Sequence, residues 1–255
     1  MPATGRTVNL LRAAPSIAKT PLELPEPVLI KAILFDLDDT LWDAAPALMR
    51  AEAAQYAWIE THAPRVAARY PNEELRNLRR DLAERRPDIA HDFTRLRIEA
   101  LAERLVECGY PAALAEDCIA HFVTVRSQVT LYDDVLPALD RLANDYALVA
   151  LTNGNADLRV SGLEGHFRAC VSPAEVGARK PDPAMFHAAL AHVGAAPAEA
   201  VHVGDQPLYD VEGARRVGLR TVWVNRTCSA WPAEYAPAHA EIATLGELEH
   251  ALGAL

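Results

Sequence analysis

The feature that most constrains the fold is the apolar run from Ala32 to Phe35, with the carboxylates Asp36 and Asp38 that follow it. Four apolar residues without polar alternation are typical of a strand buried on both faces, as in a parallel sheet. Asp36 then lies at the carboxyl end of the strand, where open α/β sheets bind ligands. Side chains alternate along an extended chain, so Asp36 and Asp38 point the same way and repel each other. Mg²⁺, which prefers carboxylate and phosphate oxygens, would offset this repulsion.

The composition excludes several classes of protein. The chain has 255 residues, of which 51% are hydrophobic, and a formal net charge of −10. This is typical of a globular protein with a substantial core, and the acidic balance argues against a nucleic-acid partner. No apolar run approaches the ~18 residues of a membrane span, so no membrane partner is expected. The four cysteines form no CxxC pair, which indicates reduced, mostly buried thiols in a cytoplasmic protein.

The chain divides into segments of different periodicity. Residues 1–28 are rich in proline, and we expect a loosely ordered extension there rather than a targeting peptide. Apolar residues then recur at helical spacing from Trp42 to about residue 128, with no strand signal between them. One helix in this stretch is expected to open at Pro111. Residues 43–128 are therefore predicted to form an all-helical cap.

Short apolar runs return after this helical stretch and alternate with helical segments. A helix is predicted between the last two runs, over Leu208–Val217. Strands that alternate with helices predict a doubly wound, Rossmann-like α/β core with a parallel sheet, built from residues 29–42 and 129–255. The predicted strands after the first are Tyr146–Leu151, Cys170–Val171, Ala200–Val203 and Thr221–Val224.

Polar side chains stand where several of these elements end. Thr152 and Asn153 follow a predicted strand and suit phosphate oxygens, although a plain polar turn has the same composition. Lys180 precedes a helix predicted from Pro183, where its ammonium group could reach an anion or simply be solvated. Asp205 and Asp210 follow another strand. Singly they are ordinary loop acids, but together with the first acid pair they could surround Mg²⁺.

The sequence FDLDDT, residues 35–40, resembles the first motif, DxDxT, of the haloacid dehalogenase-like (HAD) phosphohydrolase superfamily. Thr152, Lys180 and the pair Asp205 and Asp210 match the remaining three motifs in order. The resemblance covers about residues 31–250, and the helical insert resembles the cap of subfamily I members.

The resemblance implies a Mg²⁺-dependent phosphatase that hydrolyses a small-molecule phosphate monoester. Asp36 would attack phosphorus and form an aspartyl-phosphate, and Asp38 would protonate the leaving alkoxide and then activate water. A carboxylate at position 38 favours phosphate esters over C–Cl cleavage, because the family's dehalogenases lack it. The implied substrates are sugar phosphates, nucleotides or flavin mononucleotide. The implied supporting residues are Asp36, the carbonyl of Asp38, and Asp205 for Mg²⁺; Thr152, Asn153 and Lys180 for phosphate; Asp210 acting behind the metal ligands; and Thr40 shaping the turn.

Substrate choice is expected to lie in the cap. Arg97 and Arg95 could each clamp a second anionic group or be solvated helix arginines, and Trp42 could stack a ring or pack. His202, within an apolar strand, is interpreted as a core residue. Two rival functions stay open: a phosphomutase that uses the same residues, and a catalytically idle binding protein on this fold.

Overall fold

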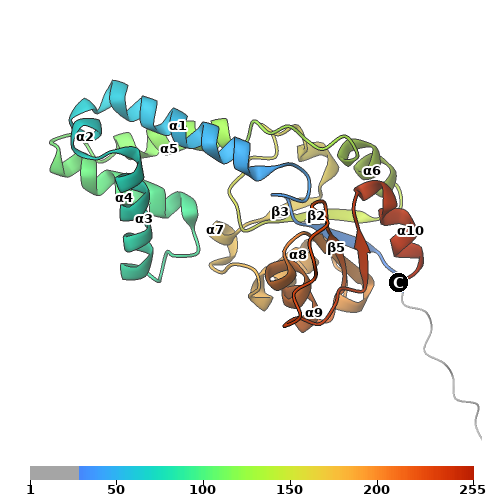
Figure 1. The fold of residues 1–255 in the computed structure, drawn as a ribbon. Coiled ribbons are helices and arrows are strands. Elements are labelled where there is room, and N and C mark those ends of the chain that lie inside the picture. Colours follow the sequence, from blue (N-terminus) through green and yellow to red (C-terminus); the bar gives the residue numbers. More distant parts are fainter. Residues whose placement is uncertain (1–28) are drawn as a thin grey trace, which may run out of the picture.

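The structure is a computed structural model that describes residues 29–255; the extension expected for residues 1–28 lies outside the described residues. The described chain forms two lobes, one built around a sheet and one made of helices (Figure 1). Among residues 29–255, no helix is both long and apolar enough to cross a membrane.

The sheet has six parallel strands in the order β3-β2-β1-β4-β5-β6. The first strand along the chain is therefore central, with β2 on one side and β4 on the other. A parallel sheet with crossover helices is the predicted fold class, and the predicted strands are confirmed within one or two residues. The strands are β1 Ala32–Phe35, β2 Ala147–Leu151, β3 Ala169–Val171, β4 Ala200–Gly204, β5 Arg220–Val224 and β6 Ala240–Ile242.

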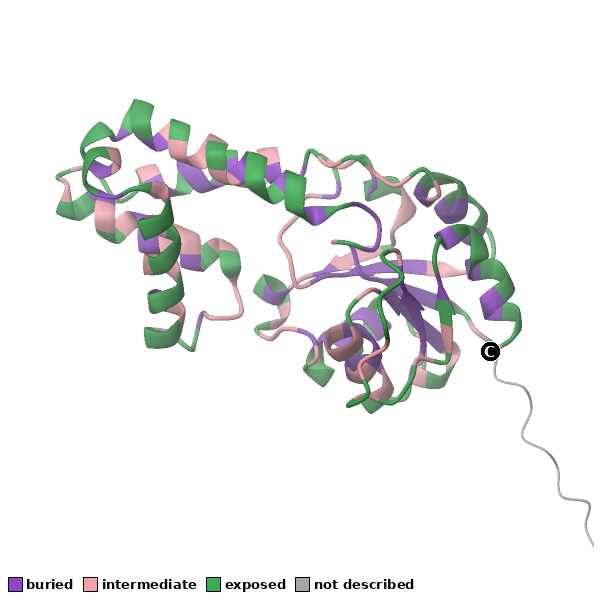
Figure 2. Cartoon of the chain, in the orientation of Figure 1, coloured by how far each residue is buried: buried purple, intermediate pink, exposed green. Residues whose placement is uncertain are grey.

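Each central strand contributes to two apolar layers because successive side chains point to opposite faces. Ile33 and Phe35 pack in the layer beneath α6 (Val135–Leu142) and α10 (Leu248–Gly253). Ala32 and Leu34 pack against the other layer, with α8 (Pro183–Val193) and α9 (Gly213–Arg216). Figure 2 shows the strands buried between these helices. The absence of polar alternation in β1 thus follows from burial on both faces.

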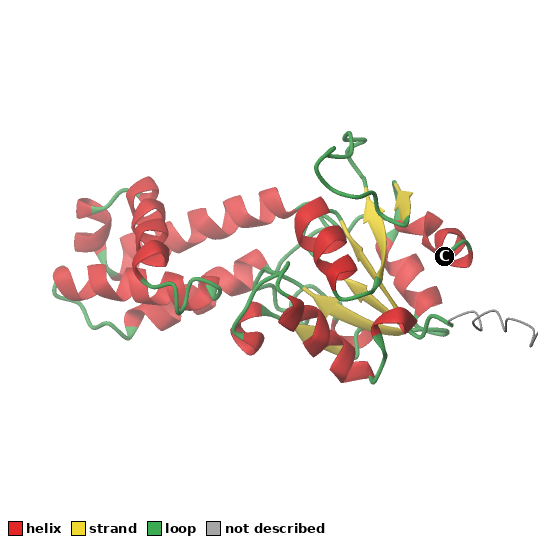
Figure 3. Cartoon of the chain, turned by 90° about the horizontal axis from the view of Figure 1, so that it is seen from below, coloured by secondary structure: helices red, strands yellow, loops and turns green. Residues whose placement is uncertain are grey.

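The helical lobe is inserted between β1 and β2, and Figure 3 shows helices without strands in it. It has its own apolar core, to which Ile59, Leu101 and Ile119 belong. Its helices lie within the interval 43–128 expected from the sequence; that this lobe acts as a cap over the site remains a prediction. The helices are α1 Ala44–His62, α2 Pro64–Arg69, α3 Asn72–Arg85, α4 Phe93–Glu107 and α5 Leu114–Arg126.

Two expected helices are wrong in detail. Pro111 does not open α5, because its carbonyl accepts the Leu114 N–H at 3.3 Å in a turn that precedes the helix. The segment expected as one helix over 208–217 begins instead with a π-helical turn, Pro207–Glu212, followed by the short α9. The wider turn brings the carboxylate of Asp210 back to the N–H of Gln206, at 2.9 Å. Isolated π turns are frequent at functional sites.

Candidate active site

The candidate site lies at the carboxyl ends of the three central strands. Asp36 follows β1, Thr152 follows β2 and Asp205 follows β4. The Asp36 N–H donates to the carbonyl of Val203 at 2.9 Å. The backbone of Asp36 is therefore still paired with the carboxyl end of the neighbouring strand β4. Since neighbouring parallel strands end at one edge of the sheet, residues more than a hundred positions apart meet there.

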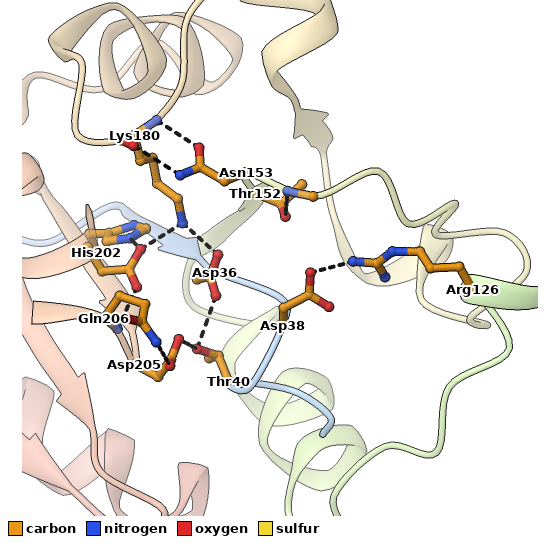
Figure 4. Close-up of polar contacts among 12 residues, drawn as sticks. Asp36, Asp38, Thr40, Arg126, Thr152, Asn153, Lys180, His202, Asp205 and Gln206 are labelled. Atoms are coloured by element: carbon orange, nitrogen blue, oxygen red, sulfur yellow. Dashed lines mark hydrogen bonds and ion pairs between the residues drawn. The ribbon is translucent and has the colours of Figure 1, made fainter. Parts of the chain in front are cut away.

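Lys180 joins two of the acids in the centre of the site. Its Nζ lies 2.6 Å from Asp36 Oδ1 and 2.6 Å from Asp210 Oδ1, and its side chain is buried (Figure 4). Asn153 holds the lysine from behind: its amide oxygen accepts the Lys180 N–H at 2.7 Å and its amide nitrogen donates to the Lys180 carbonyl at 3.0 Å. The side chain of Asn153 thus positions Lys180, and it also lines the smaller of two cavities at the site; that it binds phosphate stays a prediction.

Asp210 is the most heavily bonded acid of the group. Besides Lys180, it accepts from Nε2 of His202 at 2.9 Å and from the Gln206 N–H at 2.9 Å. His202 is fully buried in β4, as interpreted from the sequence, but its direct link to the site was not predicted. Nothing in the sequence around His202 indicated that its partner would be Asp210, because a single histidine in an apolar strand is usually a core residue.

The acids and Lys180 perturb one another because they are buried together. Burial raises the pKa of Asp36 well above its ordinary value, against the opposing charge of Lys180. Burial and the charge of Asp210 raise the pKa of Asp205 to about 7. Burial would raise the pKa of Asp210 too, but Lys180 and His202 hold it below the usual range. Burial disfavours the charge of Lys180, yet Asp210 and Asp36 keep its pKa above its ordinary value. One lysine thus faces three acids.

The three acids fit a divalent cation. One carboxylate oxygen from each of Asp36, Asp205 and Asp210 lies within 4.8 Å of the others. Asp36 Oδ1 and Asp210 Oδ1 are occupied by Lys180, which leaves Asp36 Oδ2 and Asp205 facing Thr40. The Thr40 hydroxyl lies 3.4 Å from the former and 3.5 Å from Asp205 Oδ1. Crowded oxygen ligands with a surplus of negative charge are the donor set that Mg²⁺ prefers.

Asp38 turns away from this cluster. Its Oδ1 accepts the indole N–H of Trp42 at 2.8 Å, and its Oδ2 is ion-paired with Arg126, the last residue of α5 (Figure 4). Trp42 is fully buried, so of its two alternatives, stacking on a substrate ring or packing, the structure shows packing, with the indole N–H bonded to Asp38. Arg126 was not predicted. It lies on the same buried stripe of α5 as Ile119 and Phe122, and a charged residue on such a stripe was the available signal.

A cavity of about 360 Å³ lies between the two lobes, directly beside Asp38. Arg97 lines it, while Arg95 does not: the Arg95 side chain is exposed and paired with Glu99. A smaller cavity of about 120 Å³, lined by Asp36, Lys180 and Thr152, shares Asp38 with the larger one. The other lining residues of the larger cavity are Leu48, Glu52, Arg79, Phe93, Phe122, Arg126, Asn153, Gly154 and Asn155.

This arrangement can hold a small anion against a buried carboxylate. Lys180, Thr152 and Asp36 line the smaller cavity together, and this combination of an ammonium group and a hydroxyl suits a tetrahedral oxyanion. Asp38 lines both cavities, so it is close to an anion in the smaller cavity and to the remainder of the same ligand in the larger one.

Comparisons with known proteins agree with the geometry. The sequence profile of the haloacid dehalogenase-like hydrolases matches residues 30–218. The chain is 32% identical over 227 residues to the Escherichia coli 5-amino-6-(5-phospho-D-ribitylamino)uracil phosphatase YigB, covering 86% of this chain and 94% of that protein. It is also 32% identical to the phosphoserine phosphatase of Thermus thermophilus, covering 77% and 89%. A crystal structure described as a 2-haloacid dehalogenase from Pseudomonas syringae superposes with a TM-score of 0.83 at 38% identity, covering 89% of this chain and 99% of that one.

Proposed function

Because the chain belongs to the haloacid dehalogenase-like hydrolases, a family recognisable from its four motifs, we propose that it is a Mg²⁺-dependent phosphatase of small-molecule phosphate monoesters. The observation that carries the proposal is the contact of Lys180 with Asp36, at 2.6 Å, on the wall of the smaller cavity. A cation that close both fixes the carboxylate and attracts a phosphate oxygen. The relatives named as phosphatases support the same activity.

Asp36 acts as the nucleophile in this proposal. Its carboxylate oxygen forms a bond to phosphorus as the ester P–O bond breaks, which gives an aspartyl-phosphate and an alkoxide. Lys180 and Thr152 hold the equatorial oxygens during the transfer. Asp38, protonated once its oxygen is released from the ion pair with Arg126, gives that proton to the leaving oxygen and then takes one from the water that hydrolyses the aspartyl-phosphate. Its place at the junction of the cavities supports this role.

Asp36, Asp205 and the backbone carbonyl of Asp38 would hold Mg²⁺, with Asp210 behind them fixing Lys180. The ion when bound shields the negative charge of the phosphate from the attacking carboxylate. Thr40, between Asp36 and Asp205, keeps the two acids apart and oriented.

A dehalogenase is the second candidate, because the dehalogenase crystal structure is 38% identical. The carboxylate of Asp38 favours the phosphatase. C–Cl cleavage releases chloride, which needs no proton, whereas an alkoxide leaving group does. Release of chloride from 2-chloropropionate, with no release of phosphate from any ester, would select the dehalogenase.

We expect a substrate of the size of a sugar phosphate, nucleotide or flavin mononucleotide, because the larger cavity adjoins the phosphate site. The named relatives act on small phosphorylated molecules, which supports this class. A cytoplasmic location is part of the proposal. It is supported by the four free thiols of the described chain, Cys108, Cys118, Cys170 and Cys228, although Cys228 is exposed rather than buried.

The test is hydrolysis of p-nitrophenyl phosphate by the purified protein, with Mg²⁺ and with a chelator. We expect activity only with the metal. Asp36→Asn should lower kcat by about a thousandfold or more, because an amide cannot attack phosphorus. Asp133→Asn, at an exposed position outside both cavities, is the matched control. Wild-type activity in Asp36→Asn would overturn the assignment. Turnover that requires a bisphosphate activator and releases no phosphate would indicate a phosphomutase.

A further inference from the structure

Arg126 has more hydrogen-bonding capacity than the described chain uses. Its side chain is 2% exposed, and only Nη2 is paired, with Asp38. Among the described residues, Nε and Nη1 find no hydrogen-bond partner. Buried donors left unpaired cost free energy, and most are satisfied by protein, water or ligand. Arg126 also lines the larger cavity, so a ligand there can reach it.

The ion pair of Arg126 and Asp38 lies directly against the backbone of Gly154. A Cβ at Gly154 would lie 2.7 Å from Arg126 Nη2 and 2.7 Å from Asp38 Oδ2. Any side chain at position 154 would therefore displace the ion pair. The pair is a built feature of the site, in contact with the loop that follows β2.

The charges around the cavity do not balance. Three arginines (Arg79, Arg97 and Arg126) face two carboxylates (Asp38 and Glu52), which leaves one positive charge. Glu52 is already occupied: its Oε1 accepts from Arg97 at 2.9 Å and lies 3.5 Å from Arg79. The one carboxylate that pairs with Arg126 is Asp38, which also acts in the proposed phosphatase reaction. A pocket with surplus positive charge and buried free donors binds an anion.

We propose that the alcohol part of the substrate carries a second anionic group, a carboxylate or a phosphate, which Arg126 binds through its unpaired nitrogens. The inference rests on the proposed phosphatase function. Arg126 touches Asp38, which we assign to the leaving oxygen, so the second anion sits close to the ester on the same short chain. Leu48, Phe93 and Phe122 line the rest of the cavity and contact the carbon skeleton. Arg126 is thus a specificity-determining residue.

Matched substrate pairs test this. Glycerol 3-phosphate and 3-phosphoglycerate differ by one carboxylate, and 3-hydroxypropyl phosphate and 1,3-propanediol bisphosphate differ by one phosphate. We expect the wild type to prefer the anionic member of at least one pair by about tenfold to a hundredfold in kcat/KM, as for a charge-assisted hydrogen bond. The pair that shows the preference identifies the anion. Because the ratio compares two substrates of one enzyme, changes in the chemical step largely cancel.

Arg126→Gln should reduce that preference to about threefold or less, since the charge is lost but a polar group remains. Arg126→Lys, which keeps the charge, should retain part of the preference and replaces the glutamine variant if that one does not fold. Arg85→Gln, an exposed arginine at the end of α3, should keep the wild-type ratio. An active wild type without preference in either pair would overturn the inference, as would an Arg126→Gln enzyme with the full preference. Absence of Mg²⁺-dependent p-nitrophenyl phosphate hydrolysis would instead overturn the proposed function.

Discussion

Gly204 and Asp210 are in such close contact that only glycine fits at the end of β4. A Cβ at Gly204 would stand 2.4 Å from Asp210 Cγ and 2.5 Å from its Oδ2. The π-helical turn folds the aspartate back over the strand from which it came, and Lys180 is fixed by that aspartate. The glycine is thus a packing requirement of the lysine's position.

Gly204→Ala should therefore abolish most phosphatase activity and destabilise the protein. Overpacking of a tight site costs about 1–3 kcal/mol, and here the displaced group is an acid paired with Lys180. Chemical denaturation and p-nitrophenyl phosphate kinetics measure the two effects. Gly165→Ala is the control, because a Cβ there would meet no atom within 4 Å. Wild-type activity in Gly204→Ala would show that catalysis does not depend on the observed position of Asp210.

Replacing Lys180 by methionine should be more damaging than its loss of one charge suggests. Removal of one partner from a buried ion pair costs about 3–5 kcal/mol, because the remaining charges stay buried without compensation. Asp36 and Asp210 would both be left in that state. The free energy of unfolding, measured by denaturant titration without metal, reports the effect.

A double-mutant cycle separates this explanation from lost packing. Lys180→Met combined with Asp210→Asn should recover part of the stability, since one of the two uncompensated charges is gone. Lys31→Met, which breaks an exposed pair with Glu199, should leave the unfolding free energy unchanged within error. Strict additivity of the two site substitutions would contradict the proposed coupling.

The pKa of Asp205, raised to about 7 by burial and by Asp210, predicts a dependence of stability on pH in the metal-free protein. The unfolded carboxyl has its ordinary pKa near 3.8, so between about pH 4 and 7 the folded state binds more protons. This group's contribution is therefore full at low pH and is lost as the pH rises through 7. Asp36, whose pKa burial also raises, acts in the same direction.

Asp205→Asn isolates this contribution, because an amide resembles the protonated acid at every pH. In a chelator, the variant should melt at least about 3 °C above the wild type at pH 8, and the difference should shrink as the pH falls and vanish only below about pH 4, where the unfolded carboxyl is protonated as well. With Mg²⁺ the order should reverse, since the wild type gains a ligand that the variant lacks. A constant difference across pH 5–8 would contradict a raised pKa for Asp205.

The features predicted correctly from the sequence are those that depend on local patterns, namely the strands and the residues that follow them. The uninterrupted apolar strand places Asp36 at the carboxyl end of β1. Thr152 and Asp205 follow the neighbouring strands β2 and β4, so in a parallel sheet they lie at the same edge. Lys180 was predictable from its place before a helix and its match to a motif. These residues need only the order of elements, which periodicity reveals.

Arg126 was missed, and the hydrogen-bond partners of Trp42 and Asn153 were not predicted, for a different reason. Their partners are set by side-chain packing after the elements are assembled. Arg126 meets an acid 88 positions away, and nothing near it in the chain indicates that acid. The local sequence pattern around Trp42 is the same whether its side chain packs inward or faces a ligand. In the structure, backbone bridges to Asp38 and Leu131 place it in the turn after β1, where it is buried.

Trp42→Phe tests whether the indole N–H orients Asp38. Phenylalanine keeps an aromatic ring in the buried space but cannot donate to Asp38 Oδ1, which the indole reaches at 2.8 Å. Hydrogen bonds to charged groups contribute about 1.5–3 kcal/mol, so we expect kcat to fall by about tenfold or more, with a smaller change in KM. Trp58→Phe is the control, because Trp58 stacks on His62 at 4.1 Å in the helical lobe. Melting temperatures of both variants establish that each is folded at the assay temperature. If the two enzymes lost activity equally, or if Trp42→Phe kept the wild-type kcat, Asp38 would be held by Arg126 alone.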